Sequence, residues 1–114
     1  MANRRLFYKL MIYRADFESL PDRARILYQY LNFEADDDGF VANPHRVILM
    51  ARATNEDYQA LVSAGFIMDF SAGLCAIIHW HQHNIINRDG YQKTEFTEER
   101  SQLKISSGGV YYRK

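Results

Sequence analysis

The sequence has a single cysteine, two prolines and six glycines among its 114 residues. Cys75 has no partner for a disulfide within the chain, and no Cys-x-x-Cys pair exists for a zinc knuckle. Apolar runs are short: the run at 74–78 has five residues, whereas a helix needs about 20 to cross a bilayer. The N-terminus lacks the apolar stretch of a secretion signal, so we expect a protein of the reducing cytoplasm that does not enter the membrane.

An excess of charge of one sign is also missing, because 14 basic and 14 acidic side chains cancel. The signs nevertheless separate along the chain. Residues 1–15 carry four bases and no acid, and residues 16–40 carry seven acids against two bases. A neutral protein with a basic end can bind a polyanion locally, but it lacks the overall basic charge that strong nucleic-acid binders have.

The sequence is rich in apolar and aromatic residues, and its helix and strand signals follow one another without an internal repeat. Its length is that of one domain, and a hydrophobic content of 47% excludes disorder for the body of the chain. Proline, N-cap residues and a capping box at Thr54 mark the helix starts, and apolar periodicity separates helices from strands. The predicted elements are helices over 21–34, 44–51 and 54–65, a short strand over 40–42, hairpin strands over 66–70 and 74–80, and a short helix over 97–104.

This order of elements predicts the fold class. It is α+β, mainly α: a winged helix-turn-helix with a β-hairpin wing and with N- and C-terminal extensions. We expect residues 1–105 to form the winged-helix domain with an N-terminal arm. Residues 106–114 begin with Ser and Gly and are expected to be a flexible tail or the start of a linker.

Three segments of the sequence carry a resemblance to a known family: EADDDGFVANP at 34–44, AGFI at 64–67 and IHWHQHNIINRD at 78–89. They resemble the N-terminal domain of phage replication-initiation proteins, the replisome organisers related to the DnaD primosome component. The resemblance extends over nearly all of residues 3–105. It implies a winged helix that binds DNA or mediates self-association, followed in longer members by a region that contacts single strands or the helicase-loading machinery. Phage members often have a basic pair near Asp89, of which this sequence has only Arg88.

The candidate DNA-binding residues lie on the exposed side of the predicted helix 54–65 and around it. Polar side chains there can bond to nucleobase edges or to phosphates. The basic side chains that flank the helix can contact phosphates. The acids Glu56 and Asp57 of the same helix would repel phosphate, and the alternative is that all of these are ordinary solvated side chains. The candidates are Asn55, Gln59 and Ser63 on the helix, and Arg46, Arg52, Arg88 and Lys93 around it.

The N-terminal segment has two possible roles. Tyr8 and Tyr13 lie among its four basic side chains and could stack on unpaired nucleobases. We favour a second role, in which the segment is an arm that pairs with another subunit. The side chains buried in that contact would be Leu6, Phe7, Leu10, Met11 and Ile12.

Metal binding and catalysis are not expected. His79, His81 and His83 would share one strand face with Cys75, but Cys75 and His83 would be about 26 Å apart there and cannot share an ion. The acids at 36–38 fail the spacing of a calcium loop and are expected to be a solvated turn. Neither a GxSxG motif nor a glycine-rich phosphate loop is present, so we expect no enzyme activity and no cofactor.

The sequence thus leads to two hypotheses. The first is the DNA-binding and assembly domain of a phage- or prophage-type replication initiator. Its partners would be DNA, further copies of itself as a homodimer or higher oligomer, and replication proteins such as a helicase or helicase loader. The alternative is a protein–protein oligomerisation module with a winged-helix fold and little DNA affinity.

Overall fold

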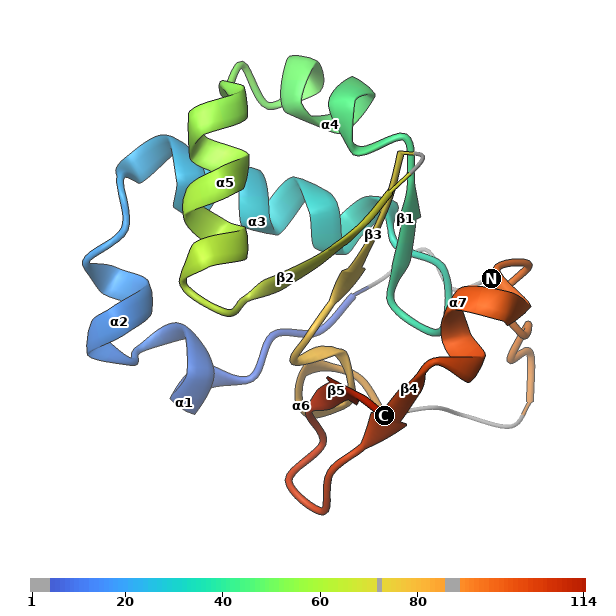
Figure 1. The fold of residues 1–114 in the computed structure, drawn as a ribbon. Helices are drawn as coiled ribbons and strands as arrows, with labels where there is room; N and C mark the ends of the chain where they lie inside the picture. The colour runs from blue at the N-terminus through green and yellow to red at the C-terminus, as the bar shows by residue number, and fades with distance from the viewer. Residues whose placement is uncertain (1–4, 72, 86–88) are drawn as a thin grey trace.

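The computed structural model describes residues 5–71, 73–85 and 89–114, and these parts form an α+β fold with seven helices and two small antiparallel sheets (Figure 1). The helices are α1 (Lys9–Ile12), α2 (Ala15–Glu18), α3 (Asp22–Glu34), α4 (Pro44–Met50), α5 (Asn55–Ser63), α6 (Trp80–His83) and α7 (Thr97–Ser101). The strands are β1 (Phe40–Ala42), β2 (Ile67–Phe70), β3 (Leu74–Ile77), β4 (Leu103–Ile105) and β5 (Tyr111–Arg113). None of the described helices is long and apolar enough to cross a bilayer.

The helix α3 is the centre of the helical layer. Its apolar residues Ala24, Leu27, Tyr28 and Leu31 recur at helical spacing and are all buried. Both α4 and α5 pack against α3, and they also contact each other. The capping box predicted for α5 is confirmed, since the Thr54 hydroxyl accepts the Asp57 N–H while the Asp57 carboxylate accepts the Thr54 N–H.

The larger sheet has the strand order β1–β3–β2, with both pairs antiparallel. Val41 and Asp69 both lie opposite Cys75, so β3 is the central strand. The predicted short strand and the predicted hairpin are therefore both present. Gly73, in the loop that joins β2 to β3, has a φ of 73°, a conformation that other residues avoid.

The strand predicted over residues 74–80 is too long. β3 ends at Ile77, which pairs with the first residue of β2, and Trp80–His83 forms one helical turn. The N–H groups of Gln82 and His83 both donate to the His79 carbonyl. A strand needs a neighbour to continue, and neither β1 nor β2 extends beside residues 79–83.

The prediction that residues 106–114 form a flexible tail is also wrong. α7 ends at Ser101, and β4 and β5 form a second hairpin joined by the turn at residues 106–110. Tyr111 anchors this hairpin, because its side chain is buried and its N–H donates to the Ile78 carbonyl over 2.9 Å. The glycines and serines of 106–109 therefore make a tight turn, in which Gly109 has a φ of 81°.

The N-terminal segment is folded onto its own chain. It forms two short helices, α1 and α2, rather than the extended arm that the sequence suggested. Phe7 packs edge-on against Phe33 of α3, with ring centroids 6.0 Å apart. Phe17 packs in the same way against Tyr28, at 5.1 Å.

Candidate nucleic-acid interface

The outer side of α5 carries the polar side chains that the sequence analysis selected. Asn55, Gln59 and Ser63 follow one another at intervals of four residues, and all three are exposed. The opposite side of the helix buries Tyr58, whose hydroxyl donates to Asp69 of β2 over 2.6 Å. This bond and the buried face fix α5 on the sheet, so the polar side faces outward. We call Asn55, Gln59 and Ser63 the α5 polar face.

One of the candidate arginines directly precedes this helix, and another lies on α4. Arg52, in the turn between α4 and α5, is exposed and has a φ of 56°, which is rare for a residue with a side chain. Arg46, on α4, is exposed and forms a long contact with Glu34, with 4.0 Å between Nη1 and Oε2. Such a surface pair contributes little to stability and leaves the guanidinium able to bind elsewhere. Glu56 is the exposed acid of the same region.

The remaining two candidates do not join this group within the described residues. Lys93 lies in the segment beside β1, at the opposite edge of the sheet from β2. There it lines a cavity of about 270 Å³ together with Glu34 and Asp36. Arg88 lies outside the described residues. Arg52 therefore directly precedes the α5 polar face, whereas Arg46 and Lys93 both lie near Glu34, Arg46 through its ion pair and Lys93 through the cavity that Glu34 also lines.

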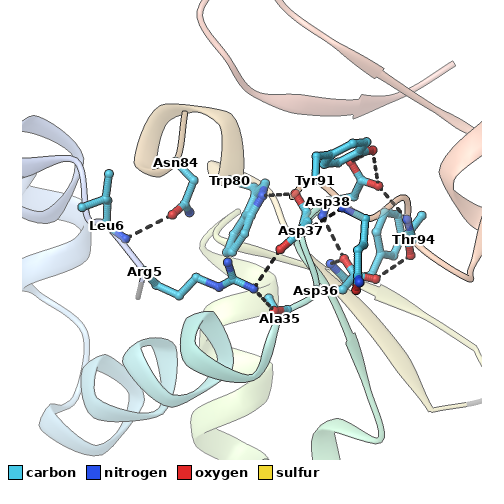
Figure 2. Close-up of polar contacts among 12 residues, drawn as sticks. Arg5, Leu6, Ala35, Asp36, Asp37, Asp38, Trp80, Asn84, Tyr91 and Thr94 are labelled. Atoms are coloured by element: carbon cyan, nitrogen blue, oxygen red, sulfur yellow. Dashed lines mark hydrogen bonds and ion pairs between the residues drawn. The ribbon is translucent and has the colours of Figure 1, made fainter. Parts of the chain in front are cut away.

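The turn at Asp36–Asp38 is not the solvated turn that the sequence suggested. Figure 2 shows that it collects hydrogen bonds from distant parts of the chain. The Asp38 carboxylate is buried and accepts the Tyr91 hydroxyl and the Thr94 N–H, both within 2.8 Å. Asp36 accepts the N–H groups of Asp38 and Phe40 at 3.0 Å and the Thr94 hydroxyl. Burial raises the pKa of the Asp36 carboxyl.

The third acid of this turn connects to the N-terminus. The Arg5 guanidinium donates to the Ala35 carbonyl over 2.8 Å and lies 3.3 Å from the Asp37 carboxylate (Figure 2). Its carbon Cζ is also 5.1 Å from the centre of the Trp80 ring, and the Trp80 Nε1–H donates to the Asp37 carbonyl. Asp36 and Asp38 thus share Thr94 as a partner, whereas Asp37 pairs with Arg5.

The histidines of the segment 79–83 hold the N-terminal segment in place. His83 Nδ1 accepts the Tyr8 N–H over 2.8 Å, so the proton of the neutral ring is on Nε2, which lies 2.6 Å from the Tyr28 hydroxyl. Burial is the main reason that the pKa of His83 falls to about 4. His79 accepts from Arg14 over 3.3 Å, and burial likewise lowers its pKa to about 4. Both rings are therefore neutral at pH 7.

No group of three or more His, Cys, Asp or Glu side chains in the described parts of the chain is arranged to hold a metal ion. The three histidines do not share a strand face, since they lie on a helical turn. His79 and His83 contact the N-terminal segment, while His81 Nε2 lies 3.1 Å from the Tyr111 hydroxyl. Cys75 is fully buried at the centre of the sheet, and burial raises the pKa of its thiol.

The five residues expected to bury themselves against a second subunit have different environments. Leu6 and Leu10 are 57% and 67% exposed and remain available for such a contact. Met11 is 1% exposed and belongs to the core of its own chain. Phe7 and Ile12 are half-buried against that core. Of the five side chains predicted to lie in a subunit contact, Leu6 and Leu10 are therefore the two that remain exposed.

The roles of the acidic turn and of the C-terminal hairpin were not predicted from the sequence. Both depend on contacts across more than fifty residues, such as those from Tyr91 and Thr94 to Asp38. A signal was present in the three tyrosines of residues 91–112, since a flexible tail rarely carries so many aromatic side chains. Searches of protein-family models, curated proteins and solved structures find no match to this chain.

Proposed function

We propose that the chain is a winged-helix DNA-binding and assembly domain of a phage- or prophage-type replication initiator, as the resemblance to replisome organisers implies. In this proposal α4 and α5 form the helix-turn-helix, and α5 enters the major groove. The hairpin β2–β3 is the wing. The domain positions itself on duplex DNA and brings other replication proteins to it.

The order of elements supports this assignment. A helix, a strand, two packed helices and a hairpin follow one another as α3, β1, α4, α5 and β2–β3, and the strands assemble in the order β1–β3–β2. The Asn43 N–H donates to the Gly73 carbonyl over 2.9 Å, so the start of α4 lies beside the tip of the hairpin. The tip is therefore next to the helix-turn-helix, as a wing must be.

The α5 polar face is the observation on which the proposal mainly rests. Asparagine and glutamine side chains can form paired hydrogen bonds with adenine in the major groove, and serine can bond to bases or phosphates. Arg52 stands in the turn before this face and Arg46 on the preceding helix, where positive charge can contact the phosphates. The exposed Glu56 lies beside this face and would repel phosphate, so the face suits base edges better than phosphate.

A binding experiment with matched variants tests this assignment. We expect Gln59→Ala to weaken binding of a duplex containing the preferred site by about 1–3 kcal/mol. Arg46→Gln and Arg52→Asn should weaken binding to all duplexes; asparagine is chosen because it tolerates the left-handed backbone at residue 52. Lys9→Gln removes the same charge from α1 and is the control. Equal duplex binding by all four variants would refute the assignment.

A second candidate function, assembly without DNA binding, is favoured by exposed apolar side chains. Leu49 and Met50 of α4 are 65% and 42% exposed, and Leu10 is exposed on α1. Measurement of mass in solution against concentration separates the possibilities. If the protein is a dimer that Leu49→Glu or Leu10→Glu dissociates, and duplex binding is undetectable at low salt, assembly is the main function.

A further inference from the structure

The hairpin β4–β5 presents an outer face with an aromatic ring and an amine side by side. Lys104 and Tyr112 are paired across the two strands, so their side chains lie on the same face. Both are exposed, Tyr112 by 47%. The alternate positions, Leu103 and Tyr111, are buried against the rest of the domain. Ile105 and Arg113, also on the inner face, are exposed, so the hairpin contacts the core mainly through Leu103 and Tyr111, and its outer face is open to solvent.

Contacts of the inner face hold this hairpin on the domain. The Tyr111 hydroxyl donates to the Asp38 carbonyl over 2.7 Å, and the Arg113 guanidinium donates to the Asp69 carbonyl over 3.2 Å. The Arg113 guanidinium also lies 4.9 Å from the centre of the Phe70 ring. Because the hairpin is already ordered, little backbone entropy would be lost when a ligand binds to its outer face.

The charge of this hairpin is of one sign. Residues 102–114 contain three basic side chains, Lys104, Arg113 and Lys114, and no acidic one. Within the part of the chain that the structure describes, neither lysine forms an ion pair. The Lys114 N–H donates to the Gln102 carbonyl, so the ladder continues and Lys114 falls on the same face as Tyr112. The exposed ring is thus flanked by two amines.

Tyr13 is another exposed tyrosine with which Tyr112 can be compared. Tyr13 also lies among basic residues and is 63% exposed, but the Lys9 amine lies over one side of its ring, 5.6 Å from the ring centre. Among the described residues no cation lies over the ring of Tyr112. Within the described part of the chain, Tyr112 therefore differs from Tyr13 in that both sides of its ring are free of a cation, and from Tyr8 in that it lies on the open face of a strand pair beside Lys104.

We propose that the outer face of β4–β5, formed by Tyr112, Lys104 and Lys114, binds single-stranded nucleic acid. One base stacks on the Tyr112 ring, and the two amines contact the phosphates on either side. Stacking on an exposed aromatic ring with nearby cations is how proteins hold single strands with little sequence preference. In a duplex the base faces are covered by their neighbours, so the ligand is a single strand.

This site is separate from the α5 polar face. The hairpin and α4 lie at opposite ends of the molecule in Figure 1, and the two surfaces share no residue. The inference therefore does not rest on the proposed function. A protein that binds duplex DNA through α5 and a single strand through β4–β5 could hold both forms of DNA at once, as the edge of an opened duplex requires.

The test is fluorescence anisotropy of a short labelled oligothymidylate at low salt with the complete chain and single variants. We expect Tyr112→Ala to weaken binding about five- to a hundredfold, as alanine does at other stacking positions, and Tyr112→Phe to bind as the wild type does. Lys104→Gln should lower the slope of log affinity against log salt by about 0.7. Tyr13→Ala is the matched control and should have no effect. Because Tyr112 is exposed, unchanged thermal unfolding verifies that each variant is folded.

Three outcomes would overturn the proposal: no binding by the wild type, equal binding by Tyr112→Ala, or loss of binding in Tyr13→Ala instead. An oligouridylate of the same length compares RNA with DNA, and binding of either that depends on Tyr112 supports the proposal. A poly-glutamate competitor that displaces the oligonucleotide at equal charge would show that the face binds acidic chains in general, and that result counts against it. Variants of α5 that abolish duplex binding should leave oligothymidylate binding unchanged.

Discussion

Acidification should destabilise this protein through His83, and the expected loss follows from the shift of its pKa. The ring is buried with Nδ1 accepting the Tyr8 N–H and Nε2 near the Tyr28 hydroxyl, so a second proton has no acceptor. Its pKa is about 4 in the folded protein, against an ordinary value of 6.5. The unfolded chain therefore binds a proton that the folded chain does not, and stability falls as the pH falls through 6.5 toward 4.

The magnitude follows from the two pKa values. Between pH 7.5 and pH 5, the loss attributable to His83 is about 2 kcal/mol, and it reaches about 3 kcal/mol at pH 4. His79 and His81 add losses of the same sign, because burial lowers their pKa values too. The pKa of Asp36 is raised, and its effect has the opposite sign, since the folded state then binds its proton more readily.

Urea unfolding at a series of pH values between 7.5 and 5 measures the contribution of His83 to the pH dependence of stability. The wild type and His83→Gln are compared, because glutamine cannot take up a proton. We expect the variant to be less stable at pH 7.5, since it loses the bonds to Tyr8 and Tyr28, but to lose about 2 kcal/mol less than the wild type over the range. Parallel curves for the two proteins would refute the reasoning.

Three further perturbations have expected results. Gly39→Ala should destabilise the protein by more than about 2 kcal/mol, because its Cβ would lie 2.6 Å from Cγ of Trp80 and its φ is 87°; Gly65→Ala, with a similar φ and nothing within 4 Å, should cost about 1 kcal/mol, and tryptophan fluorescence during denaturation compares the two. Thr54→Ala should cost about 1 kcal/mol through loss of the capping box, and hydrogen exchange at the first turn of α5 should accelerate. Tyr111→Phe should cost about 1–3 kcal/mol, measured by calorimetry, because the Asp38 carbonyl and His81 lose a buried partner.

The parts of the fold that sequence could predict are those with local causes. The helix α3 follows from the spacing of its apolar residues, and α5 from a capping box contained within four residues. The β2–β3 hairpin follows from two apolar runs joined at Gly73. Each of these signals lies within the element that it predicts, so nothing beyond neighbouring residues is needed.

The errors concern features with distant causes. The apolar run through Trp80 favours a strand, but β3 stops where its neighbours stop, and nothing in residues 74–80 reports that limit. Consecutive aspartates favour a solvated turn, yet Asp38 is buried because Tyr91 and Thr94 supply its hydrogen bonds. Such pairings cannot be deduced from composition or periodicity.

The candidate site was predicted in part. The exposure of Asn55, Gln59 and Ser63 on one side of α5 was predicted because helical periodicity fixes which positions face outward. Lys93 was placed with them only because it follows the wing in sequence, and the structure puts it at the other edge of the sheet. Distance along the chain was a poor guide there.

We propose that duplex DNA binds to α5 with the help of Arg46 and Arg52. The most direct measurement is the affinity of the wild type for duplex DNA over a salt series, compared with a variant that carries both Arg46→Gln and Arg52→Asn. We predict a steep linear fall of log affinity with log salt for the wild type and a slope smaller by about 2 for the variant. Identical slopes for the two proteins, or no duplex binding at the lowest salt, would contradict the account.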